Sequence, residues 1–162
     1  MIHAYVSSRL DQHNELLVGL PDYQYRKLRR IQYAAARILL RTKFEGHMSP
    51  VLRKLHWLPA ELRIDFKILL TVYKCLNGLA PSYLTELVQV KSSDKDLRSN
   101  DTLELKYPKL DQKFTTATYG DRAFSVVSRK LWKSIPFTIR NCETVSQFKS
   151  ALKTHLFRKW LK

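Results

Sequence analysis

The sequence contains few glycines and few cysteines, and both shortages limit what the chain can be. Four glycines in 162 residues argue against a loop-rich β fold and against a glycine-rich loop that would cradle a phosphate. The two cysteines, Cys75 and Cys142, are too few for a disulfide scaffold and lack the spacing of a zinc site. The histidines are scattered and form no ligand pair. We therefore expect no metal and no other cofactor in this chain.

Acidic residues are also scarce, and this shortage excludes one kind of chemistry. The chain has 14 acidic and 29 basic residues, a formal net charge of +15. It contains no Asp-Asp dipeptide, so it lacks the paired aspartates with which polymerases hold two divalent cations. Asp11, Asp65 and Asp121 lie near basic residues, and we interpret them as solvated or ion-paired carboxylates. We expect no catalytic residue, and the positive excess favours nucleic acid or an acidic membrane surface as partner.

Long apolar runs are missing as well. No uncharged apolar stretch reaches the length of about 20 residues that a bilayer span requires. The opening residues, Met1 to Ala4, carry no basic segment before an apolar one, so no signal peptide is predicted. We expect an intracellular protein, cytoplasmic or nuclear, that is neither secreted nor membrane-embedded. The apolar content of 44% is enough for a modest core.

The pattern that is present is helical. The spacing of apolar residues predicts helices over residues 2–18, 23–40, 50–56, 60–77, 81–88 and 121–133, and a last helix that begins at Thr144. The expected fold is a mainly α multi-helix domain with at most a small β-hairpin. It divides into an N-terminal helical part (1–88), a long irregular connection (89–118) and C-terminal basic helices (119–162), which together form one compact domain.

The predicted basic helix at 23–41 is the best amphipathic element in the chain. Four arginines, Arg26, Arg30, Arg37 and Arg41, fall within an arc of roughly 60°, and Lys27 and Arg29 flank them. The opposite face is predicted to be buried and carries Leu28, Ile31, Ala35, Ile38 and Leu39. Arginines at this spacing can contact successive phosphates. The alternative is a solvated surface that keeps a basic protein soluble.

The remaining charges and aromatic residues have simpler interpretations. Residues 1–60 carry a net charge of +6, residues 61–120 of +1 and residues 121–162 of +8, so the two ends are the parts expected to face a polyanion. A second, weaker basic cluster consists of Arg122, Arg129 and Lys130. Aromatic side chains on apolar faces usually anchor a core, which is the role that we predict for Trp57, Trp132 and Trp160.

Several short motifs carry a resemblance to a known family. The first is Leu55-His56-Trp57-Leu58-Pro59, followed by Arg63 to Lys67 and by Leu79-Ala80-Pro81-Ser82-Tyr83-Leu84. Others lie on both sides, at residues 5–11, 19–21, 32–37, 97–99, 119–125 and 148–153. In this order, and over nearly the whole chain, the motifs resemble the C-terminal region of reverse transcriptases from non-LTR retrotransposons, the long interspersed elements, of the Jockey-like clade.

The resemblance implies a role without chemistry of its own. It places the chain in the thumb and the region after the palm of an RNA-directed DNA polymerase, where such enzymes grip the element's RNA and the template–product duplex. The magnesium ions of that reaction would belong to the missing palm. We therefore expect a non-catalytic fragment that is not an enzyme, with RNA or an RNA–DNA duplex and the upstream palm as partners. The proposed contact residues are the two basic clusters: Arg26, Lys27, Arg29, Arg30, Arg37, Arg41, Arg122, Arg129 and Lys130.

Two alternatives remain open at this point. In the first alternative, the chain is a helical packing module that supports a palm or forms a homodimer. An exposed apolar face would favour this alternative. In the second it is a degenerate remnant with no independent function. An arginine stripe that is exposed and unpaired favours nucleic acid, whereas one paired with Asp or Glu beside an exposed apolar face favours packing.

Overall fold

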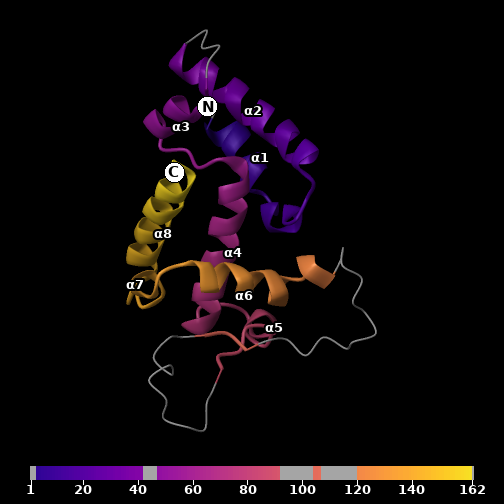
Figure 1. Cartoon of the computed structure of the whole chain (residues 1–162), viewed down its shortest axis with the longest axis vertical. Helices are drawn as coiled ribbons and strands as arrows, with labels where there is room; N and C mark the ends of the chain where they lie inside the picture. The colour runs from indigo at the N-terminus through magenta and orange to yellow at the C-terminus, as the bar shows by residue number, and fades with distance from the viewer. Residues whose placement is uncertain (1–2, 42–46, 92–103, 107–119, 162) are drawn as a thin grey trace. The chain divides into compact units, whose positions relative to one another are not determined.

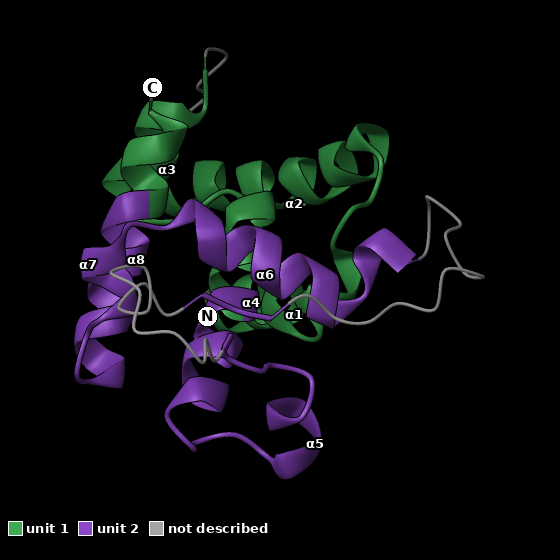
Figure 2. Ribbon diagram, turned by 60° about the horizontal axis from the view of Figure 1, so that its bottom comes forward, with its two compact units in different colours: residues 1–67, 156–162 green, residues 68–155 purple. Residues whose placement is uncertain are grey.

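The computed structural model describes residues 3–41, 47–91, 104–106 and 120–161, and in these ranges the chain is mainly α-helical, as predicted (Figure 1). The chain forms two compact units, which Figure 2 colours separately. Unit 1 comprises residues 1–67 and 156–162, and unit 2 comprises residues 68–155. Unit 1 is therefore built from both ends of the chain. None of the described helices combines the length and the apolar character that a membrane crossing requires.

The first elements of unit 1 are short. They are a π-helical turn, η1 (His3–Ser7), helix α1 (Ser8–Asp11) and a 3₁₀ turn, η2 (Asn14–Leu17). We predicted one helix over residues 2–18, which is wrong because His13 has a left-handed backbone with φ of 50°. An L-residue in this conformation cannot continue a right-handed helix. Helix α2 (Asp22–Leu40) then follows with nearly the predicted bounds.

The buried face of α2 differs from the prediction. Ile31, Ile38 and Leu39 are 53%, 64% and 39% exposed. Ala35 is buried as predicted, and Gln32 and Ala36 are buried as well. The small alanines lie in the core of unit 1, where a large side chain would hold neighbouring elements apart. Gln32 tolerates burial because its Nε2 donates a 2.7 Å hydrogen bond to the backbone oxygen of Leu58, and a buried polar group needs such a partner.

The core of unit 1 connects α2 to helix α3 (Ser49–Lys54) and to the turn that follows it. Trp57 is buried there, and Trp160 from the end of helix α8 (Val145–Trp160) packs against this core half-buried. The predicted anchoring role of both tryptophans is thus confirmed. The buried members of the cluster are Ala35, Ala36, Met48, Val51, Leu52 and Trp57.

Helices α3 and α4 (Ala60–Leu76) end in the same hydrogen-bonded motif. After α3, the His56 amide bonds to the Arg53 oxygen and the Trp57 amide to the Leu52 oxygen. After α4, Gly78 and Leu79 make the equivalent bonds, which define a Schellman motif. Its key residue is left-handed, with φ of 67° at Gly78 and 52° at His56. Glycine adopts this conformation freely, whereas it costs another residue about 1 kcal/mol.

Unit 2 is held together by an aromatic cluster. Phe148 of α8 is fully buried and stacks on Tyr73 of α4, with ring centroids 4.2 Å apart. Trp132 of α6 (Phe124–Ser134) lies 6.1 Å from Phe148 on a second side. Tyr73 also donates its hydroxyl to the backbone oxygen of Cys142 at 2.6 Å. The predicted burial of Trp132 is confirmed.

The short elements of unit 2 complete the described chain. Helix α5 (Ser82–Thr85) is shorter than the predicted helix at 81–88, and the 3₁₀ turn η5 (Gly120–Arg122) precedes α6. Helix α7 (Phe137–Arg140) precedes α8, whose start is capped by Thr144 because the Gln147 amide donates to its hydroxyl. One antiparallel bridge joins Val90 to Leu105. Most of the predicted connection at 89–118 lies outside the described residues.

Candidate nucleic-acid interface

The basic residues of α2 fall into two groups, and the first group is ion-paired within the protein. Arg26 lies 2.8 Å from Asp22, one turn earlier on the helix, and both side chains are largely exposed. Arg29 contacts Asp22 at 3.0 Å and also Glu61 at the start of α4. Exposed pairs such as Arg26–Asp22 contribute little stability, but the pairs orient these two arginines toward their own protein.

The electrostatics of Arg29 and Asp22 agree with this assignment. Burial by itself would lower the pKa of the Arg29 guanidinium, but the hydrogen bond and charge of Glu61, together with Asp22, raise it above its usual value. The hydrogen bond from Arg26 lowers the pKa of Asp22, and the charges of both arginines add to the effect. A negative charge in the first turn also interacts favourably with the helix dipole. Asp22 therefore stays ionised and occupies both arginines.

The second group is exposed and has no acidic partner. Lys27, Arg30 and Arg37 are exposed, and no ion pair joins them to any residue that the structure describes. At about 100° and 1.5 Å per residue they fall within an arc of about 80° and extend over about 15 Å. This length matches about four successive phosphates of one strand of a duplex. Arg41, which ends the helix in a left-handed conformation, is exposed as well.

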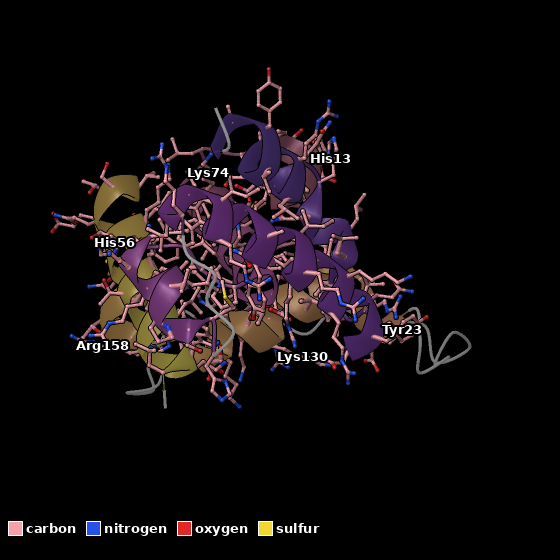
Figure 3. The ribbon with its side chains drawn as sticks, turned by 90° about the horizontal axis from the view of Figure 1, so that it is seen from above. His13, Tyr23, His56, Lys74, Lys130 and Arg158 are labelled. Atoms are coloured by element: carbon pink, nitrogen blue, oxygen red, sulfur yellow. The ribbon has the colours of Figure 1, made fainter. Side chains whose placement is uncertain are left out.

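Exposed apolar side chains flank this group on α2. Ile31 and Ile38 lie beside Lys27 on the helical wheel, and Tyr23 projects from the first turn with 59% of its surface exposed (Figure 3). The exposed face of α2 is thus basic along one edge and apolar along the other. Exposed cations without an acidic partner favour nucleic-acid binding, and exposed apolar side chains favour packing. Helix α2 carries both features.

The second predicted cluster does not form a comparable patch. Arg129 is half-buried and donates from Nε to the backbone oxygen of Leu105 at 2.9 Å. Lys130 is exposed and lies 3.3 Å from Asp121, while Arg122 is half-buried in η5. The space beside Arg129 has a volume of about 10 Å³, which is room for about one water molecule. The side chains of Arg129 and Lys130 thus connect elements of unit 2.

The three isolated aspartates have distinct environments. Asp11 forms an ion pair with Arg63 through two contacts, of which Nε–Oδ1 is 2.7 Å, and Asp121 pairs with Lys130. Asp65 is different, because burial raises the pKa of its carboxyl; Lys159 acts against this shift, and Glu61 adds to it. No cluster of three metal-ligating side chains occurs in the described part of the chain.

The raised pKa of Asp65 gives a prediction with a defined sign. A carboxyl whose pKa is higher in the folded state makes folding less favourable above that pKa, and the penalty disappears as the pH falls. We therefore expect Asp65→Asn to stabilise the protein at pH 7 and to have no effect at a pH of about 3, below the value of an unperturbed aspartate. Urea unfolding between pH 3 and 7 measures this difference.

The matched control for this experiment is Asp22→Asn, because the pKa of Asp22 is shifted in the opposite direction. Removing its charge should destabilise the protein at pH 7, and this loss should also vanish in acid. Equal effects of the two variants at pH 7 would contradict the assigned environments.

Sequence reasoning missed a third basic group, at the end of α3. Arg53, Lys54 and His56 line an open hollow of about 460 Å³ in unit 1, together with Ser49, Pro50 and Leu161. The adjacent Arg53-Lys54 pair was visible in the sequence, but nothing indicated that the end of the chain would form one wall.

A comparison with family models, with curated proteins and with solved structures found no match for the chain.

Proposed function

We propose that the exposed basic face of α2 binds the phosphate backbone of RNA or of an RNA–DNA duplex, as a non-catalytic part of a reverse-transcriptase-like protein. The observation that carries the proposal is the trio Lys27, Arg30 and Arg37, exposed and without an acidic partner in the described residues. Two neighbouring arginines on the same helix are neutralised by Asp22 and Glu61, so the unpaired trio is not explained by internal ion pairing.

The rest of the chain is consistent with a charge-based contact that does not depend on sequence. The net charge of +15 would raise the local concentration of a polyanion. Lysine and arginine contacts to phosphates fix position without reading bases. In this proposal the protein brings no bond chemistry of its own, and the polymerase palm and its magnesium ions belong to an upstream partner.

The salt dependence of binding tests the proposal directly. The probe is a fluorescein-labelled RNA–DNA duplex of 20 base pairs, and the readout is fluorescence anisotropy with the full chain. Three neutralised phosphates predict that Kd rises about 40-fold between 50 and 200 mM salt, and further contacts would steepen the slope. A Kd that is flat over this range would overturn the proposal.

A second candidate function rests on the apolar edge of α2. Ile31 and Ile38 are exposed, and such residues on one helix face suit packing against another polypeptide. The salt experiment separates the candidates, because apolar association does not weaken as salt is added. Binding to nucleic acid that disappears with salt favours the basic edge, whereas self-association that persists or strengthens favours the apolar edge.

A further inference from the structure

His56 has an unfavourable backbone conformation that its contacts in the protein do not explain. It is left-handed, with φ of 52°, at the position of the Schellman motif that Gly78 occupies after α4. Its side chain is exposed and makes no hydrogen bond to a described residue. The core contacts of this turn come from its neighbours Leu52 and Trp57. A glycine at position 56 would preserve the turn and relieve the strain.

The imidazole lies instead on a hollow that is lined by cations. Arg53 and Lys54 from the last turn of α3 share this hollow of about 460 Å³ with His56. Both are exposed and unpaired with described acidic residues, and none of the described residues that line the hollow is acidic.

These groups match the chemistry of a phosphate. A guanidinium donates two parallel hydrogen bonds to phosphate oxygens, and an ammonium group supplies a point charge. The imidazole adds a further donor, and the Ser49 hydroxyl on the same hollow can donate as well. A residue kept in an unfavourable backbone conformation is a reason to look for a function of its side chain.

We infer that the hollow formed by Arg53, Lys54 and His56 binds a phosphodiester group of nucleic acid, with the imidazole as one of its hydrogen-bond donors. This inference rests on the proposed function, because it assumes that nucleic acid is the partner. It adds a second contact point in unit 1, separate from α2 in sequence. It also assigns a role to the histidine of the Leu55–Pro59 motif.

The test compares three variants with the full chain, using the labelled RNA–DNA duplex at 50 mM salt. Arg53→Gln/Lys54→Gln should raise Kd about tenfold and reduce the salt slope by about one. His56→Gly should raise Kd about threefold, as expected for one lost hydrogen bond. The same His56→Gly protein should unfold about 2–4 °C higher, because the strain at this position is gone. Weaker binding together with higher stability excludes misfolding as the cause.

The charge-matched control is Lys149→Gln/Lys153→Gln, two exposed lysines one turn apart on α8. The inference is overturned if Arg53→Gln/Lys54→Gln weakens binding no more than this control does. It is also overturned if His56→Gly binds as tightly as the unaltered chain. If replacing Lys27, Arg30 and Arg37 weakens binding but replacing the residues of the hollow does not, only this inference is overturned. If replacing the residues of the hollow weakens binding but replacing those three residues does not, the proposed binding of nucleic acid by α2 is overturned.

Discussion

Replacing Lys27, Arg30 and Arg37 together by glutamine is expected to weaken binding of the RNA–DNA duplex about 100-fold at 50 mM salt. Each lost phosphate contact removes the release of about one counterion, so the salt slope should fall by about 2 to 3. Glutamine is a good helix former, and all three side chains are exposed, so α2 should remain intact. Anisotropy titrations at several salt concentrations measure both quantities, and circular dichroism confirms the helix.

The control for this variant removes the same charge elsewhere. Lys133, Lys149 and Lys153 are exposed residues of α6 and α8 in unit 2. Their joint replacement by glutamine lowers the net charge equally, but at positions that the proposal leaves out of the contact. We expect a change in Kd of no more than about threefold, from the loss of long-range attraction. Similar losses in the two triple variants would show that net charge, and not the α2 surface, governs binding.

Phe148→Ala is expected to destabilise the protein by about 3–5 kcal/mol, as for other truncations of a buried phenylalanine. Phe148 has no exposed surface and contacts Tyr73 and Trp132 as the centre of the aromatic cluster. Its removal would leave a cavity between two rings that cannot close it without moving. Domains of this size are stable by about 5–15 kcal/mol, so much of the total stability depends on this residue. Urea unfolding followed by circular dichroism measures the loss.

Phe137→Ala is the matched control for this prediction. It removes the same atoms from α7, but Phe137 is 45% exposed, so its cost should stay below about 1 kcal/mol. Tryptophan fluorescence offers a local readout, because Trp132 lies beside Phe148 whereas Trp57 and Trp160 belong to unit 1. A Phe148→Ala protein as stable as Phe137→Ala would contradict the central place of this cluster.

The helices were predictable from sequence because their signals are local. The bounds of α2, α4 and α8 lie close to those that the apolar periodicity predicted, and Thr144, the predicted start of the last helix, caps α8. The buried face of α2 was not predictable in the same way. Periodicity ranks Ile31 and Ile38 above Gln32 as core residues, but the neighbouring elements determine which of these side chains is buried. Gln32 finds the Leu58 oxygen, 26 positions later in the chain, and no local pattern records this.

The candidate site was predictable only in part, because some of its features depend on local spacing and others on contacts between distant residues. The exposed positions of Arg30 and Arg37 follow from their place on the helix, because they lie opposite Gln32 and Ala35. That Arg29 would instead reach Glu61 depends on a contact across 32 positions. The hollow at His56 depends on Leu161 from the end of the chain. Local spacing thus indicates which face is basic, while tertiary contacts decide which cations remain unpaired.

The composition of unit 1 has a consequence for the order in which the protein can form. The core cluster that connects α2 to α3 includes Trp160, whereas the other members of this cluster lie before residue 60. During synthesis, the N-terminal helices would leave the ribosome long before the residue that completes their packing. A premature stop codon directly after His155 would therefore damage unit 1, although most of that unit is translated earlier than unit 2. Unit 2, which is continuous from Ile68 to His155, does not depend on the last residues in this way.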